Sequence, residues 1–257
     1  MAAEPPDPIE TVLDGASPPD RSLLLLNRET PKPVVTLLEE AFENHSLTVA
    51  DRDVPNGAGD IACLVEDGEI VATTPLSELE EAFLLVNADR YRSGTKQIRS
   101  GSFPDVLTAL NDTEFTVRGF PKSNREKLLL ILISRFIEHR ALDAGDGRLR
   151  ATFQRLSRLD DERGTKRVYS WLADSGVDTH VYGVDDDPEA VPELDVSVHT
   201  GRNELYRRSW FVVFRPPEGG DGVALVAIET GENVWRGMWT RDADRVRQVD
   251  SYLEAWF

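Results

Sequence analysis

Residues 149–184 constrain the fold most, because they predict a strand, a helix and a second strand in close succession. Leu149, Ala151 and Phe153 alternate with polar residues, which is the two-residue period of a strand with one buried face. Residues 178–184 predict the second strand. A strand that returns to its sheet through a helix runs parallel to the first, with a right-handed crossover. The stretch therefore predicts an α/β core.

The helix inside this stretch is marked by its ends and by one apolar face. Thr165 is a plausible N-cap, and Gly176 stands where a left-handed residue after the helix is expected. Val168, Trp171 and Leu172 follow the spacing of a buried helix face.

The remaining elements extend this unit into a larger sheet. Residues 22–53 again predict strand, helix and strand, and residues 123–140 predict a long buried helix. Four strands without an intervening helix are predicted at residues 194–199, 210–214, 223–228 and 234–239, followed by a helix at 242–256. The expected fold class is α/β: a mixed central sheet covered by helices, with strand–helix–strand units, antiparallel C-terminal strands and a closing C-terminal helix.

The domain organisation follows from the same reading. Residues 1–20 are acidic and rich in proline, and we expect an N-terminal arm there. Residues 21–257 are expected to form a single domain with an N-terminal half at 21–142 and a C-terminal half at 149–257. Whether the N-terminal half is a duplicated unit stays open, because strand–helix–strand units recur in unrelated folds.

The composition indicates a cytoplasmic protein. Residues 1–20 contain no apolar signal-peptide core, and the longest apolar run, residues 128–133, is far too short to span a bilayer. We therefore expect no membrane partner.

The charge points to a salt-rich habitat. The net charge is −17, and only five of the 29 basic residues are lysines. An abundance of carboxylates with few lysines indicates a halophilic protein, because at about 1 M salt the Debye length is about 3 Å and surface carboxylates hardly repel one another. A nucleic-acid surface would need clustered Lys and Arg, so no nucleic-acid partner is expected.

Known catalytic motifs are absent from the sequence. Neither a dinucleotide or phosphate glycine loop, nor HExxH, nor GxSxG occurs. The four histidines are far apart and never at i, i+4, so a helical pair of metal ligands is excluded. Cys63, the single cysteine, lies in an apolar run and is expected in the core. We expect no catalytic residue and no metal site.

The strand at residues 178–184 carries one pair of candidate ligand-binding residues. His180 and Tyr182 share one face of this strand. Open α/β sheets bind ligands beyond the C-terminal ends of their strands, so this pair is a candidate site. The alternative, a strand packed under a helix, remains open at this point.

A second candidate lies near the C-terminus. Trp235 and Trp239 share a strand face with Gly237 between them, which leaves a flat slot for an aromatic ligand or for a packed helix. Arg236 belongs either to an anion site or to solvated salt bridges with the abundant carboxylates.

Several C-terminal segments together resemble the DICT family of sensory domains, in its stand-alone haloarchaeal type. The resemblance is carried by residues 153–157 (FQRLS), 168–172, 177–183 (VDTHVYG), 210–214 (WFVVF), 224–229 (ALVAIE) and 235–240 (WRGMWT). It is good over residues 149–257 and looser over residues 22–142. The family is named for its association with diguanylate cyclases and two-component systems, and the resemblance carries over no catalytic residue.

The resemblance implies a non-catalytic, cytoplasmic sensory domain. Such a domain would bind a small ligand or a signalling protein and act in trans on a histidine kinase, a cyclase or a transcription factor. The resemblance implies no particular cofactor. Two alternatives stand beside it: an enzyme of unrecognised type that uses His180 and Tyr182, and an adaptor that oligomerises through the helix at residues 242–256 and the terminal Trp256 and Phe257.

Overall fold

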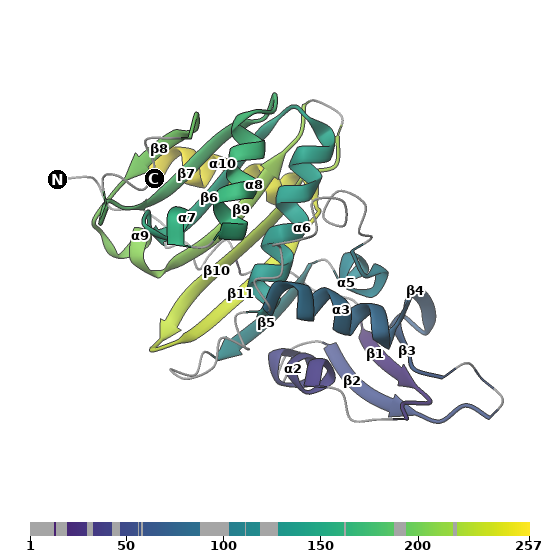
Figure 1. The fold of residues 1–257 in the computed structure, drawn as a ribbon. Helices are drawn as coiled ribbons and strands as arrows, with labels where there is room; N and C mark the ends of the chain where they lie inside the picture. The colour runs from purple at the N-terminus through teal and green to yellow at the C-terminus, as the bar shows by residue number, and fades with distance from the viewer. Residues whose placement is uncertain are drawn as a thin grey trace.

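A computed structural model shows a mixed α/β protein with two sheets (Figure 1). It describes residues 13, 20–29, 33–42, 47–55, 57, 59–87, 103–110, 112–118, 128–161, 163–187, 194–217 and 220–257. The expected fold class is confirmed. The predicted N-terminal arm lies outside the described residues except for Leu13 and Asp20, and the division into domains stays a prediction.

The smaller sheet has four strands in the order β2-β1-β3-β4. These are β1 (Arg21–Leu26), β2 (Leu47–Arg52), β3 (Ile61–Glu66) and β4 (Glu69–Pro75). β1 and β2 are parallel and the other pairs are antiparallel. Helices α2 (Pro33–Phe42), α3 (Leu76–Asn87) and α5 (Asp105–Ala109) contribute to the core on one side of this sheet, where the side chains of Leu23, Leu25 and Leu64 are fully buried.

The larger sheet has seven strands in the order β5-β11-β10-β9-β6-β7-β8. Their bounds are β5 (Thr113–Arg118), β6 (Arg148–Arg155), β7 (Asp178–Val184), β8 (Ser197–Thr200), β9 (Ser209–Arg215), β10 (Val223–Gly231) and β11 (Val234–Thr240). β6, β7 and β8 are parallel neighbours, as the strand–helix–strand pattern predicts for β6 and β7. The other neighbouring strands pair antiparallel.

Helices cover both faces of this larger sheet (Figure 1). One face carries α6 (Leu128–Ala144), α7 (Arg158–Asp161) and α8 (Arg163–Ala173), and the other carries α10 (Ala243–Trp256). The predicted run of four strands without a helix was wrong, because the short helix α9 (Glu204–Arg208) stands between β8 and β9. No helix in the described part of the chain is long and apolar enough to cross a bilayer.

Strand β6 differs from its prediction in an instructive way. Its Leu149 and Ala151 are buried as expected, but Arg150 and Thr152 on the opposite face are buried as well. The polar residues suggested a solvated face, whereas α10 covers it. The alternation therefore identified a strand but not its second packing partner.

The ends of the helices were predicted with mixed success. Asp242 caps α10, and its carboxylate accepts hydrogen bonds from the backbone N–H groups of Asp244 and Arg245. Thr165 is not an N-cap, because α8 begins at Arg163 and the Thr165 side chain is buried. Gly176 does not need a left-handed conformation. It is required because a Cβ atom there would lie 2.5 Å from the Gly145 carbonyl oxygen. The first residues of the predicted central helix, 123–127, lie outside the described part.

We expect Gly237→Ala to destabilise the protein by about 1–3 kcal/mol, because small-to-large changes in a packed interior force neighbours apart. A Cβ atom at Gly237 would lie 2.8 Å from the Phe115 ring and 2.8 Å from the Ala227 Cβ atom. Urea unfolding measures the change. Gly231→Ala is the control, since its nearest neighbour would be 3.8 Å away. Equal stabilities of the two variants would contradict the packing described.

Candidate ligand-binding site

A cavity opens where β6 and β9 separate. The two strands pair from Arg148 with Arg215 to Ala151 with Val212. Beyond this point side chains replace the main-chain ladder. The Thr152 hydroxyl accepts a bond of 2.9 Å from the Phe211 N–H and donates one of 3.2 Å to the Ser209 carbonyl.

The bond to Ser209 is shared with the next polar side chain of β6. The Gln154 amide donates to the same carbonyl at 2.9 Å. Gln154 has a backbone φ of 47°, and the pairing of β6 with β7 shifts register between Thr152 and Arg155. The end of β6 is thus an irregular strand held by side chains, and the gap beside it is the cavity.

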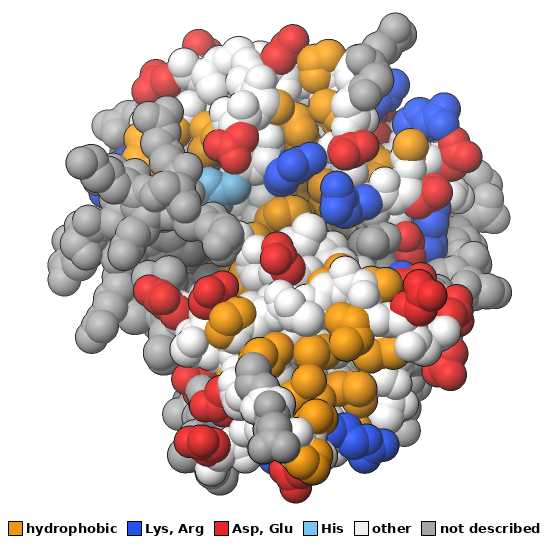
Figure 2. Space-filling view, turned by 90° about the vertical axis from the view of Figure 1, so that its right-hand side faces the viewer, with side chains coloured by type: hydrophobic (Ala, Val, Ile, Leu, Met, Phe, Trp, Pro, Cys, Tyr) orange, Lys and Arg blue, Asp and Glu red, His pale blue; other side chains and the backbone are white. Residues whose placement is uncertain are grey.

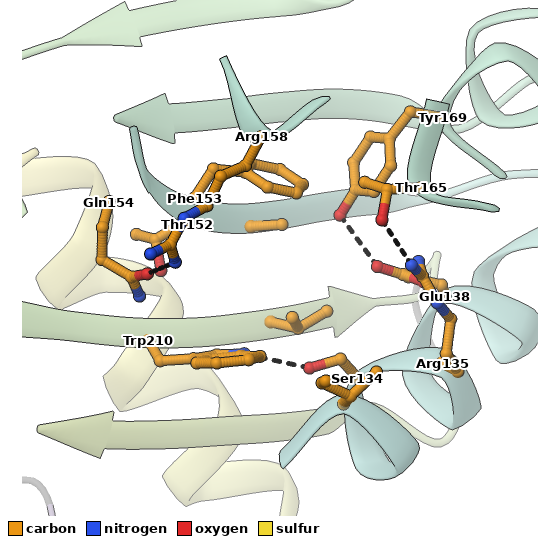
Figure 3. A pocket seen from close by; sticks show the side chains of 13 residues that line it. Ser134, Arg135, Glu138, Thr152, Phe153, Gln154, Arg158, Thr165, Tyr169 and Trp210 are labelled. Carbon is orange, nitrogen blue, oxygen red and sulfur yellow. Dashed lines mark hydrogen bonds and ion pairs between the residues drawn. The ribbon is translucent and has the colours of Figure 1, made fainter. Parts of the chain in front are cut away.

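The cavity has a volume of about 80 Å³ and lies under α6 and α8 (Figure 3). Its lining residues are Ile131, Ser134, Arg135, Glu138, Ala151, Thr152, Phe153, Gln154, Arg158, Thr165, Tyr169, Trp210 and Val212. An apolar cavity of about 150 Å³ holds a benzene molecule, so this space fits several waters or a small part of a larger ligand.

A buried ion pair forms one wall of the cavity. Arg135 and Glu138, one turn apart on α6, meet at 2.5 Å, and their side chains are 10% and 4% exposed. The Arg135 guanidinium also donates to the Thr165 hydroxyl at 2.6 Å, and the Tyr169 hydroxyl donates to Glu138 at 3.1 Å. These extra hydrogen bonds offset the cost of taking both charges out of water.

Tyr169 acts in this wall as a hydrogen-bond donor. Burial raises the pKa of its hydroxyl well above the usual value, and the negative charge of Glu138 raises it further. The hydroxyl therefore keeps its proton at physiological pH and holds the Glu138 carboxylate in place.

The opposite wall combines an indole with polar groups. The Trp210 N–H donates to the Ser134 hydroxyl at 3.1 Å, and Ser134 donates in turn to the Leu130 carbonyl at 2.8 Å. At the mouth, Arg158 donates to the Gln154 side-chain oxygen. The lining contains neither histidine nor cysteine. The chemistry of the walls, with flat apolar surfaces and fixed hydrogen-bonding groups, suits binding rather than nucleophilic catalysis.

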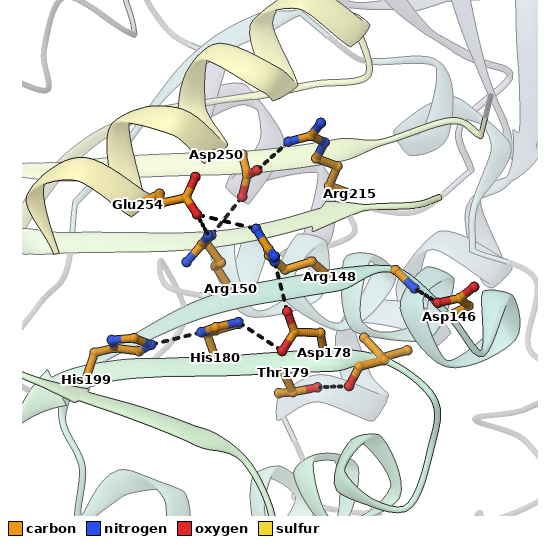
Figure 4. A network of polar contacts seen from close by, with 12 residues as sticks. Asp146, Arg148, Arg150, Asp178, Thr179, His180, His199, Arg215, Asp250 and Glu254 are labelled. Carbon is orange, nitrogen blue, oxygen red and sulfur yellow. Dashed lines mark hydrogen bonds and ion pairs between the residues drawn. The ribbon is translucent and has the colours of Figure 1, made fainter. Parts of the chain in front are cut away.

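A polar network occupies the opposite face of β6 (Figure 4). Arg150 of β6 pairs with Asp250 of α10 at 2.7 Å, and Arg215 meets the same carboxylate at 3.0 Å. The Arg150 guanidinium also donates to the Tyr182 hydroxyl. Burial raises the pKa of Tyr182, so its hydroxyl stays protonated.

Two histidines continue this network at the edge of the sheet. His180 Nδ1 lies 2.9 Å from His199 Nε2, and His180 Nε2 lies 3.0 Å from the Asp178 carboxylate. A hydrogen bond between two ring nitrogens needs one N–H and one lone pair, so the contact holds a single proton. Burial acts to raise the pKa of Asp178, but hydrogen bonds from His180 and Arg148 together lower it.

The structure therefore places His180 and Tyr182 on one face, as predicted, but away from the cavity. Tyr182 stacks on His199 with ring centres 4.4 Å apart. Sequence reasoning missed the residues that line the cavity. The available signal was Arg135 and Glu138, two oppositely charged residues at i, i+3 that follow the apolar run at residues 128–133.

The predicted slot between Trp235 and Trp239 is filled. The Phe115 ring of β5 lies over Gly237, as the close approach at this glycine shows. Trp239 packs edge-on against Phe136 of α6 with ring centres 5.8 Å apart. Of the two occupants considered, an aromatic ligand or a packed helix, the structure supports the helix, because α6 packs against Trp239. Sequence periodicity did not show that Phe115 also fills the space from the neighbouring strand.

The other members of this predicted site also pack within the protein. Trp235 meets Trp210 edge-on, with ring centres 6.2 Å apart. Arg236 forms a salt bridge of 2.9 Å with Glu114 on the neighbouring strand β5. The structure thus gives Arg236 the salt-bridge role of the two considered, and it does not bring these three residues together with His180 and Tyr182.

Comparison with known proteins identifies the segment that holds the cavity. Residues 105–228 match the family DICT, described as "Sensory domain in DIguanylate Cyclases and Two-component system", and every residue that lines the cavity falls inside this range. No curated protein matches the chain. Among solved structures, the chain is similar to "Crystal Structure of Polyphosphate Kinase from Porphyromonas Gingivalis", with 12% identity and a TM-score of 0.35 over 95% of this chain and 46% of that one. The chain thus spans less than half of that kinase.

We expect Glu138→Gln to destabilise the protein by about 3–5 kcal/mol, because removing one member of a buried ion pair takes a counter-ion away from the buried Arg135 guanidinium. Chemical denaturation measures the loss. Glu204→Gln is the matched control: its pair with Arg207 has the same i, i+3 spacing but side chains that are 55% and 70% exposed. We expect the control to change stability by less than about 0.5 kcal/mol. A similar small loss for both variants would show that the cavity wall does not depend on the buried pair.

Stability should fall on mild acidification, in part through His199. Burial lowers the pKa of His199, and the positive charges of His180 and Arg150 lower it further. The unfolded chain then binds more protons than the folded one, so this contribution is complete above the unfolded pKa of about 6.5 and is lost as the pH falls.

Urea unfolding at a series of pH values between about 7 and 5 tests this expectation. His199→Gln should give a shallower dependence of unfolding free energy on pH than the unchanged protein. Burial also lowers the pKa of His139, but His139 is present in both proteins, so the difference reports on His199. Identical slopes would refute the assignment.

Proposed function

We propose that this chain senses a small molecule bound in the cavity between β6, β9, α6 and α8. The match of residues 105–228 to DICT, a family described as a sensory domain, supports this proposal. The observation that carries the proposal is the position of the cavity. It lies wholly within the sensory segment, at the one end of β6 where side chains rather than the main chain hold β6 to β9.

The side-chain hydrogen bonds between β6 and β9 offer a way for a bound ligand to change the separation of the two strands. Thr152 and Gln154 bond to the backbone of β9 beside the cavity. A ligand with its own hydrogen-bonding groups would compete for the same partners and favour a different separation of the two strands. A ligand shifts such an equilibrium only by its difference in affinity for the two arrangements, so it must bind where the arrangements differ.

The signal would leave through a partner in trans. The family description names diguanylate cyclases and two-component systems, which supports a cyclase or a histidine kinase as the partner, and a transcription factor stays a prediction from the sequence. The strand β6 connects the cavity to the network under α10, because Thr152 and Arg150 are two residues apart on the same strand. The cytoplasmic location and the identity of the partner stay predictions from the sequence.

One observation favours the alternative of an enzyme. The contact of 3.0 Å between His180 and Asp178 resembles the orientation of a histidine base by a carboxylate. However, the second nitrogen of His180 faces His199, and the Tyr182 hydroxyl accepts from Arg150. A His180→Ala variant separates the two functions: under the sensory proposal it still binds the ligand of the cavity.

The proposal predicts that blocking the cavity mouth abolishes ligand binding. Native mass spectrometry and absorbance of the purified protein identify a co-purified molecule, and a thermal-shift screen with a small-molecule library identifies further ligands. Arg158→Trp, at the mouth, should weaken their binding by at least about tenfold, or about 1.4 kcal/mol. The screen should detect this as a lost shift in the melting temperature.

Arg167→Trp is the matched control, since Arg167 is an exposed residue of α8 that lies over Trp171 and does not line the cavity. Its ligand response should equal that of the unchanged protein. Ligands that bind Arg158→Trp and Arg167→Trp equally well would place the ligand site elsewhere.

A further inference from the structure

The four-stranded sheet is apolar on both faces, but the described helices pack on only one of them. The pairing registers place a second set of side chains together on the other face, which we call the open face. It consists of Leu24, Leu26, Ala50, Ile61, Val65 and Ile70 around Cys63, which is itself buried. None of them belongs to either of the two core clusters formed by the described residues.

Exposure is greatest where β4 borders this face. Ile70 is 61% exposed and its neighbour Val71 is 48% exposed. Figure 2 shows hydrophobic side chains gathered on the lower part of the molecule, where Figure 1 places this sheet. A contiguous apolar patch on a highly charged protein marks a surface that binds another macromolecule.

The charges around the open face indicate what covers it. The chain has 46 acidic residues, yet the strand positions on this face carry no carboxylate and one cation, Arg52. Arg52 ends the outer strand β2, while the exposed Asp67 and Glu69 lie at the hairpin that opens the other outer strand, β4. The cation and the carboxylates therefore occupy diagonally opposite corners of the sheet. The nearby carboxylate of Asp51 is already paired with Arg28.

This diagonal arrangement is self-complementary. If two copies stack their open faces about a two-fold axis with the strands crossed, each Arg52 meets the hairpin of the other copy. Crossed packing of two sheets is one of the two common geometries of sheet-on-sheet contact. A two-fold interface uses the same patch on both subunits, so each favourable pair occurs twice.

We infer that the open face is a homodimer interface, in which two copies pack their four-stranded sheets face to face with Arg52 near Asp67 in the β3–β4 hairpin of the other copy. The inference does not depend on the cavity or on its ligand. Two copies of net charge −17 repel one another at long range, so the dimer should strengthen as salt screens this repulsion.

Sedimentation equilibrium of the full chain tests the interface, at protein concentrations from about 1 to 100 µM and in KCl from about 0.2 to 2 M. We expect a dimer that is favoured by protein and by salt. Ile70→Glu should make the protein monomeric throughout, because it places two carboxylates in the apolar contact. Its stability should hardly change, because this side chain is exposed in the monomer.

The matched control is Val198→Glu, which adds the same charge at an exposed apolar residue of the other sheet, on strand β8. It should dimerise like the unchanged protein. A chain that is monomeric under every condition overturns the inference. So does a dimer that persists in Ile70→Glu or dissociates equally in Val198→Glu.

A charge swap tests the crossed arrangement. Arg52→Glu should weaken dimerisation by at least about fivefold, and the double variant Arg52→Glu, Asp67→Arg should restore it. Because Arg52 and Asp67 lie at opposite corners of one subunit, restoration requires contact between subunits. A double variant as weak as Arg52→Glu would overturn the proposed pairing.

Discussion

The ion pair between Arg150 and Asp250 fixes the C-terminal helix to the centre of the larger sheet. The two side chains are 4% and 1% exposed and come from positions 100 residues apart. Each charge has further partners: Arg150 donates to the Tyr182 hydroxyl, and Arg215 approaches Asp250 from the next strand. With these additional partners the buried ion pair lowers the stability of the fold little, whereas removing one member would destabilise the protein strongly. The position of α10, and with it the second buried face of the sheet, depends on this contact.

Strand β6 is consequently the element through which the two sides of the sheet communicate. Arg150 binds the helix on one face, Leu149 and Ala151 pack under α6 on the other, and Thr152 begins the side-chain bonds that border the cavity. Any change in the separation of β6 and β9 therefore acts within two residues of the pair that holds α10. This proximity gives the sensory proposal a physical route from a bound molecule to the surface of the C-terminal helix.

Local sequence signals predicted the local structure well. The parallel pair β6 and β7 and the C-terminal helix α10 followed from hydrophobic periodicity. The cavity did not, because it depends on where β6 and β9 diverge, and no periodic pattern records the partner of a strand. The same limitation explains the filled slot at Gly237, whose occupant, Phe115, comes from a strand far away in the chain. Arg135 and Glu138 can be recognised in the sequence as charged residues after an apolar run, but only the structure shows that they form an ion pair with each other.

The place of β11 in the sheet shows that the segment of sequence similarity is shorter than the part of the chain that must fold together. The matched segment ends at residue 228, yet β5, which lies near its start, is hydrogen-bonded to β11 (Val234–Thr240) alone among the described strands. Glu114 of β5 and Arg236 of β11, whose side chains form a salt bridge, are 122 positions apart. During synthesis β5 must therefore wait without its neighbour until nearly the whole chain has emerged, whereas the strands of the smaller sheet are complete much earlier. A fragment cut at the borders of the similarity would leave β5 unpaired and β10 as a bare hydrophobic edge prone to aggregation.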